Sequence, residues 1–105
     1  GLWAQRELVE AGGGLQVPGD PVLLSCRSSG FAFRSNAVLW YRQAPAARLE
    51  WVSTISAYSS VIKYGSSVRG RATTLRDNAQ SMASLSLQAL NHQDSARYFC
   101  SIRIQ

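Results

Sequence analysis

The chain has 105 residues, of which 46% are hydrophobic and 16% are charged, and its formal net charge is +5. A chain of this length fits one domain, and the composition excludes a disordered or fibrous protein. The basic residues are scattered without a basic run, so they favour a solvated surface over a nucleic-acid-binding one. The apolar stretches are only a few residues long, which excludes a membrane-spanning helix from these residues.

Short alternating runs of apolar and polar residues predict strands in place of helices. Residues 1–4 are expected to be a leader remnant or an expression scar, and residues 5–105 to form the domain. In chain order, the predicted strands are 22–26, 38–42, 49–55, 71–76, 83–87 and 96–100. Glycine, proline, aspartate and asparagine separate these runs, at a spacing that predicts an all-β sandwich or barrel.

Two cysteines, Cys26 and Cys100, lie far apart in the chain. Zinc sites use closely spaced Cys or His pairs and the chain has a single histidine, so no metal site is expected. The cysteines alone fit either a reduced protein with two thiols or an oxidised one with a long bridge. Trp40 lies between them and Tyr98 lies just before Cys100. In a two-sheet sandwich a tryptophan fills the space beside a bridge, and a tyrosine at this corner ties its hydroxyl back to the chain.

At these residues the chain resembles the heavy-chain variable domains of antibodies, over most of its length. The matching segments are EAGGGL (10–15), LSC (24–26), SGFAF (29–33), WYRQAP (40–45), LEWVS (49–53), GR (70–71), RDN (76–78) and DSARYFC (94–100). The resemblance implies a variable-type Greek-key immunoglobulin sandwich with a Cys26–Cys100 disulfide between its sheets. It also implies an oxidising secretory route, and therefore an extracellular location, either secreted or in the ectodomain of a receptor.

The resemblance also assigns structural roles to several residues. It places Trp40 and Tyr98 in the core, and it pairs Arg71 with Asp94 and Arg42 with Glu50 as framework ion pairs. The glycines at 12–14 lie where the first strand of the family changes sheets. His92 lies in a polar turn without a hydroxyl placed for it to activate, so we expect no catalytic residue, no enzyme activity and no cofactor.

Variable loops at one end of this fold bind antigen. The resemblance places the first loop at about 31–37, the second at about 56–63 and the third after Ile102. The serines and the tyrosine of the second loop are typical of antigen-binding surfaces, because tyrosine supplies contact area at low entropic cost and serine supplies adaptable hydrogen bonds. The predicted antigen-contacting residues are Phe31, Arg34, Ser35, Asn36, Ser56, Tyr58, Ser59, Ser60, Lys63 and Arg103.

One sheet face of the family packs against a partner variable domain. The residues predicted on that face are Leu39, Tyr41, Gln43, Arg48, Leu49, Trp51 and Phe99. Leu49 and Trp51 resemble domains that pair with a light chain, whereas Tyr41 and Arg48 resemble single-domain antibodies. The partner is open between a light chain, another receptor variable domain and self-association. Unusual framework segments, together with Ala72 where an aromatic residue is expected, suggest either a divergent receptor, such as a T-cell receptor chain of heavy-chain-like type, or an unusual species.

The family continues past the third loop into a final strand, which is missing from these 105 residues. We therefore expect the strand at 96–100 to have an unpaired edge, which is costly. The open explanations are a longer chain, a strand donated by a partner chain and a truncated domain. The expected function is antigen recognition in adaptive immunity. The alternative is an invariant variable-type module for receptor assembly or adhesion, and neither nucleic acid nor membrane is expected to contact this domain.

Overall fold

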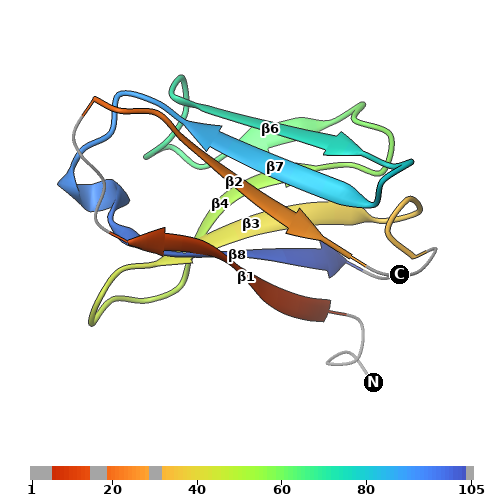
Figure 1. Ribbon diagram of the computed structural model, residues 1–105, viewed down its shortest axis with the longest axis horizontal. Coiled ribbons are helices and arrows are strands. Elements are labelled where there is room, and N and C mark those ends of the chain that lie inside the picture. The colour runs from red at the N-terminus through yellow and green to blue at the C-terminus, as the bar shows by residue number, and fades with distance from the viewer. Residues whose placement is uncertain (1–5, 15–18, 29–31, 104–105) are drawn as a thin grey trace.

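The computed structural model describes residues 6–14, 19–28 and 32–103. Within these residues the elements are strands and one short 3-10 helix, and most of the strands are labelled in Figure 1. They are β1 (Arg6–Gly14), β2 (Val22–Arg27), β3 (Ala37–Gln43), β4 (Glu50–Ile55), β5 (Ile62–Tyr64), β6 (Ala72–Asp77), β7 (Met82–Leu87), the helix η2 (His92–Asp94) and β8 (Ala96–Arg103).

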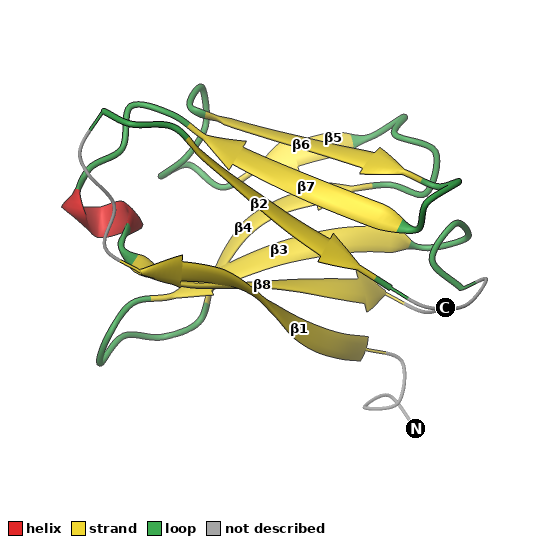
Figure 2. Ribbon diagram, viewed as in Figure 1, coloured by secondary structure: helices red, strands yellow, loops and turns green. Residues whose placement is uncertain are grey.

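The strands form two sheets that face each other (Figure 2). The larger sheet has the order β1-β8-β3-β4-β5, the smaller has the order β2-β7-β6, and the neighbouring strands pair antiparallel. The period-two alternation seen in the sequence explains the packing. On β7, Ala83, Leu85 and Leu87 are buried while the residues between them are partly exposed. One face of each strand therefore meets the core, and the predicted all-β sandwich is confirmed.

The core lies between the two sheets around the predicted disulfide, which is present. Cys26 on β2 is bonded to Cys100 on β8, and the two Cα atoms are 6.5 Å apart. The side chain of Trp40 is fully buried in the same cluster, beside Val38 and Leu85. The bridge therefore ties the two sheets together within the apolar core.

The edge of β8 is not unpaired, and the expectation of an open edge was wrong. β1 pairs with β8 along its whole length, from Arg6 opposite Arg103 to Gly14 opposite Ala96. The expected change of sheets at the glycines is not found either, because β1 stays in the larger sheet with one register shift between Glu10 and Gly12. The physical reason is that a bare row of backbone N–H and C=O groups is costly, and an extended segment that lies alongside satisfies it.

Two strand boundaries differ from those predicted in ways that affect the binding surface. The second loop is shorter than expected, because β5 begins at Ile62 and so Lys63 lies on a strand. β5 is too short to show a period-two pattern in the sequence, which is why it was not predicted. At the other side, β8 extends beyond the predicted end to Arg103.

Candidate binding site

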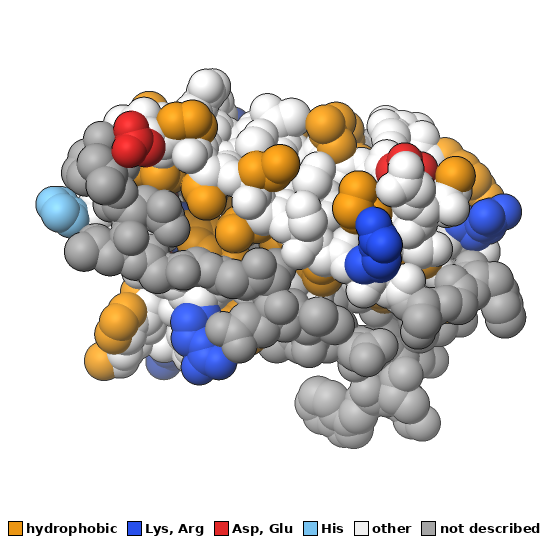
Figure 3. Space-filling view, in the orientation of Figure 1, with side chains coloured by type: hydrophobic (Ala, Val, Ile, Leu, Met, Phe, Trp, Pro, Cys, Tyr) orange, Lys and Arg blue, Asp and Glu red, His pale blue; other side chains and the backbone are white. Residues whose placement is uncertain are grey.

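Three loops of the described chain gather at one end of the sandwich, which we call the loop end. It comprises residues 32–36 between β2 and β3, 56–61 between β4 and β5, and 78–81 between β6 and β7, at the right of Figure 1. β8 also ends there, at Arg103. Basic side chains are visible at this end of the molecule in Figure 3.

The second loop is a tight turn closed by its own serines. The backbone N–H of Ser56 donates to Val61 O over 2.9 Å, and the Ser56 hydroxyl oxygen accepts from the Val61 N–H at 2.9 Å. It also lies 3.3 Å from the hydroxyl of Ser60. Ser59 has a φ of 66°, so the chain reverses sharply beside Tyr58. This turn leaves Tyr58 76% exposed, so its ring extends into solvent.

The first loop contributes fewer contact residues than the sequence suggested. Arg34 and Ser35 are exposed. Asn36 is 8% exposed, and its Nδ2 donates to Ala32 O over 2.7 Å, so it stabilises the turn instead of facing an antigen. Its assignment to the contact surface is corrected on that ground. Phe31 lies outside the described residues.

Arg76 on β6 joins the two loops. Its Nη2 donates to Phe33 O at 2.7 Å, and its Nη1 donates to Ser56 O at 2.9 Å and to Ile55 O at 3.3 Å. Its Nε donates to Oδ1 of Asn78 at 2.8 Å, and the guanidinium carbon lies 4.6 Å from the centre of the Phe33 ring. Burial lowers the pKa of Arg76. The planar fork of arginine supplies donors in fixed directions, so one side chain holds both loop backbones.

Asn78 extends this support, since its Nδ2 donates to Ala57 O at 2.8 Å. Neither Arg76 nor Asn78 was predicted as a site residue, although both belong to the RDN segment that carries the family resemblance. The segment marks a strand end, but no local pattern indicates that its side chains reach two other loops. That contact depends on how the sheets pack.

The outer face of the larger sheet carries the residues predicted to meet a partner domain. Leu49 is 45% exposed and Trp51 is 37% exposed, and the Trp51 Nε1 donates to Thr54 Oγ1 at 2.9 Å. Leu39 is only 7% exposed, so it offers a partner little surface, and its role as a contact residue stays a prediction. Leu39 lies on the central strand with neighbours on both sides, paired with Thr54 and Ser101, which limits its access to solvent.

The remaining residues of that face lie around this pair. Tyr41 and Phe99 are partly exposed and are directly paired across β3 and β8. The guanidinium of Arg97 lies over the Phe99 ring at 5.7 Å. Gln43 is exposed, with its Nε2 donating to Ala47 O at 3.0 Å, and Arg48 is also exposed. The face therefore mixes apolar and polar groups.

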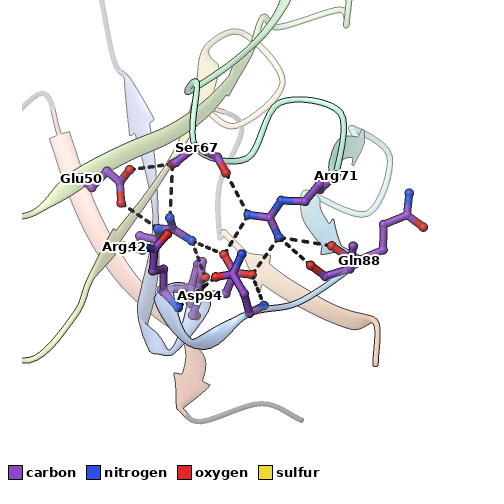
Figure 4. A network of polar contacts seen from close by, with 10 residues as sticks. Arg42, Glu50, Ser67, Arg71, Gln88 and Asp94 are labelled. Atoms are coloured by element: carbon purple, nitrogen blue, oxygen red, sulfur yellow. Dashed lines mark hydrogen bonds and ion pairs between the residues drawn. The ribbon is translucent and has the colours of Figure 1, made fainter. Parts of the chain in front are cut away.

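A network of charges lies at the opposite end of the sandwich (Figure 4), which we call the framework end (residues 44–49, 65–71 and 88–95). Arg42 contacts Glu50 through Nε–Oε1 and Asp94 through Nη1–Oδ1, both at 2.8 Å. Arg71 contacts Asp94 through Nη1–Oδ2 at 2.8 Å. The two ion pairs suggested by the resemblance are thus joined by a third contact. Ser67 adds to it by donating from Oγ to Glu50 Oε2 at 2.8 Å.

Asp94 is the centre of this network and is 1% exposed. Burial alone would raise its pKa, but hydrogen bonds from Arg71, from the Asn91 backbone N–H and from Arg42 lower the pKa to about 2. Burial would lower the pKa of Arg42, but its hydrogen bonds to Glu50, Tyr98 and Asp94 raise it. Each charge is therefore stabilised in its ionised form.

The network also holds the backbone before β8. The Tyr98 hydroxyl donates to Asp94 O at 2.7 Å and accepts from Arg42 Nη1 at 3.1 Å. Asn91 caps η2 by accepting from the Gln93 N–H, while the carboxylate of Asp94 accepts from the Asn91 N–H. These contacts are made within the domain, around the buried carboxylate of Asp94, so we assign them a role in fixing the framework.

Other kinds of site find little support in the described residues. Among residues 6–14, 19–28 and 32–103, no group of three or more His, Cys, Asp or Glu is placed to hold a metal ion. His92 is exposed at the start of η2. In the same part of the chain, no helix is long and apolar enough to cross a membrane.

The two facing sheets, their central disulfide and the loops gathered at one end define a variable-type immunoglobulin domain. Residues 15–105 match the immunoglobulin V-set domain family. Because the match covers most of the chain, the protein belongs to this family. V-set domains typically bind other proteins or pair with partner variable domains, are typically extracellular, and are not known as enzymes.

Proposed function

We propose that this domain recognises antigen through the loop end, as a heavy-chain-like variable domain of an antibody or antigen receptor located outside the cell. The observation that supports the proposal is that the backbones of two loops are fixed by hydrogen bonds while a side chain at the tip of one loop is exposed. Arg76 binds the carbonyls of Phe33, Ile55 and Ser56, while Tyr58 in the adjacent turn is 76% exposed.

This contrast is what a recognition surface requires. A loop that is already ordered pays less conformational entropy when it binds, so more of the contact energy appears as affinity. An exposed tyrosine provides a large contact area with few rotatable bonds, and the neighbouring serines provide hydrogen bonds of adaptable direction. In this proposal the contact residues are Arg34, Ser35, Ser56, Tyr58, Ser59, Ser60, Lys63 and Arg103.

A second candidate function is an invariant interaction module for receptor assembly or adhesion. The observation that favours it is the exposure of Leu49 at 45% and Trp51 at 37%, on the outer face of the larger sheet. Large exposed apolar groups on one face are typical of protein interaction surfaces. A light chain, another receptor domain or a second copy of this chain would cover them. A strand donated by a partner at β8 would first have to displace β1, which pairs with it.

The experiment that separates the two functions is sequencing of related transcripts from the tissue that expresses this chain, with primers placed on the β2 and β8 coding segments, which enclose both loops. Antigen recognition predicts that sibling chains differ mainly at residues 34–35 and 56–61, while β4 and β7 stay nearly constant, because loop tips vary without unfolding the core. Identical loops in all siblings would overturn antigen recognition and favour the invariant module.

A further inference from the structure

We infer that the loop end, if it binds antigen as proposed above, is built for an acidic segment of a protein antigen, which Arg34, Lys63 and Arg103 contact. The inference rests on where the positive charges lie and on where the carboxylates lie. Both follow from the strand register and the hydrogen bonds of the described residues.

The three cations come from three different elements at the loop end of the larger sheet. Arg103 ends β8 and pairs with Ala37, the first residue of β3. Lys63 on β5 pairs with Thr54, which in turn pairs with Leu39. Leu39 pairs with Ser101, two residues before Arg103. Paired residues and every second residue point to the same side of a sheet, so Lys63 and Arg103 share the outer face.

Arg34 belongs to the first loop, which leads directly into β3, the strand whose first residue, Ala37, pairs with Arg103. Like Lys63 and Arg103, Arg34 is exposed. Among the described side chains, no salt bridge joins any of these three cations to a carboxylate. Arg76, beneath the loops, adds a fourth positive charge, since its acceptors are backbone carbonyls and the amide of Asn78.

None of the carboxylates with described side chains lies on the larger sheet at the loop end. Glu50 and Asp94 belong to the network at the framework end, and Asp20 precedes β2 at that same end. Asp77 lies at the loop end but on the smaller sheet, where it accepts from the backbone N–H groups of Ala79 and Gln80.

Asp77 also has a basic neighbour on its own sheet. Both Asp77 and Arg27 pair with Met82, so they flank β7 on the same face. The positive charge of the larger sheet at the loop end is therefore uncompensated by the described carboxylates.

A surface of this kind selects for an acidic ligand. Uncompensated positive charge raises the encounter rate with a negative partner, and carboxylates accept strong charge-assisted hydrogen bonds from arginine. A protein segment fits better than a nucleic acid, since the cations are spread over three elements and are interleaved with serines. In the described loops Tyr58 is the exposed aromatic residue, whereas single-stranded nucleic acid requires a row of aromatic platforms.

The test compares two peptides and two charge-reversed variants. The probes are a Glu-Gly-Tyr repeat peptide and its Gln-Gly-Tyr counterpart, and binding is measured by biolayer interferometry at low and at physiological salt. The loop variant carries Arg34→Glu and Lys63→Glu. The matched control carries Arg48→Glu and Arg69→Glu at the framework side, which changes the net charge equally. Thermal unfolding of both shows that they are folded, and the single Arg34→Gln replaces the loop variant if it is not.

We expect the glutamate peptide to bind more tightly than the glutamine peptide. The loop variant should lose about tenfold in affinity for it, about 1.4 kcal/mol, while the control changes less than about twofold. Equal losses in the two variants would overturn the inference, because total charge and not the loop end would then set affinity. Equal binding of the two peptides, or tighter binding of heparin or single-stranded DNA, would also overturn it.

Failure of this inference is distinguishable from failure of the proposed function. Ligands are selected from a displayed peptide library of unbiased charge and then tested against Tyr58→Ala. If the selected ligands are neutral or basic but depend on Tyr58, loop-based recognition stands and the acidic preference is wrong. If no selected ligand depends on Tyr58, the proposed recognition by these loops fails as well.

Discussion

The two ends of the sandwich use arginine in opposite ways. At the framework end, Arg42 and Arg71 are paired with the buried carboxylate of Asp94. At the loop end, Arg76 binds backbone carbonyls and one amide, with no carboxylate among its hydrogen-bond acceptors. The first arrangement neutralises charge and locks strands together. The second orders two loops by hydrogen bonds to their backbone carbonyls. No carboxylate neutralises the guanidinium of Arg76 in this arrangement.

The difference shows how one fold separates stability from recognition. A buried ion network is costly to disturb, because removal of one partner leaves a desolvated charge. Hydrogen bonds from an arginine to loop carbonyls fix the backbone but place no demand on the exposed side chains at the tips. Residues at the tips can therefore change while the framework end stays constant.

The largest expected effect comes from the bridge that holds both ends to one core. Cys100→Ala should lower the free energy of unfolding by about 4 kcal/mol, because the reduced chain regains the entropy of a long loop. Chemical denaturation measures the loss, and Ser101→Ala on the same strand is the control. An unchanged unfolding midpoint would contradict a stabilising role for the Cys26–Cys100 disulfide.

Removal of the central carboxylate of the framework end should come next. Asp94→Ala should cost about 3 kcal/mol, since Arg42 and Arg71 keep their charges without a buried partner. Glu50→Ala, at the exposed side of the same network, should cost less. Both are measured by thermal or denaturant unfolding. A loss at Glu50 as large as that at Asp94 would show that the network has no buried centre.

Acid should weaken the framework end within a defined pH range. The pKa of Asp94 is lowered from 3.8 to about 2, so its ionised form contributes stability above pH 3.8 that is lost as the pH falls toward 2. The contribution is about 2 kcal/mol. Denaturant unfolding across this range should show the loss in the native chain and a shallower loss in Asp94→Asn. Asp20→Asn is the control and should lose stability with falling pH as the native chain does. If Asp94→Asn loses stability just as steeply, the acid sensitivity does not come from Asp94.

A substitution at the loop end should disturb order more than stability. Arg76→Lys keeps the charge but cannot reach the carbonyls of Phe33, Ile55 and Ser56 together, and we expect a loss of about 1 kcal/mol. Hydrogen exchange should speed up at 32–36 and 56–61 while the framework end stays protected. Faster exchange at both ends would show that Arg76 supports the whole domain.

The smallest effect on stability is expected at the tip of the second loop. Tyr58 is 76% exposed, so Tyr58→Ala should change the free energy of unfolding by less than about 0.5 kcal/mol. Binding of a ligand selected on the loop end should fall by at least about tenfold, because tyrosine is a frequent anchor of such surfaces. A large drop in melting temperature would instead assign Tyr58 to the fold.

Much of the framework was predictable from the sequence because its signals are local or depend on spacing. Alternating residues predicted β2, β3, β4, β6, β7 and β8. The positions of Cys26, Trp40, Tyr98 and Cys100 indicated a bridged sandwich, and the family text around them assigned Arg71 to Asp94. The side-to-side alternation along each strand follows from the local sequence, whereas the bridge and the Arg71–Asp94 pair join distant segments and were predicted through the family resemblance.

The features that only the tertiary structure decided all depend on contacts between segments far apart in the chain. β1 pairs with β8 because the backbone groups at that edge would otherwise have no hydrogen-bond partners. No residue of β1 indicates in the sequence which strand it will pair with. Arg76 contacts two loops because the packing of the two sheets brings β6 beside them. Leu39 is buried by the strands on both sides of β3. Periodicity and segments that resemble the family assign a residue to a strand or loop. Which other elements its side chain contacts is set by the packing of the two sheets.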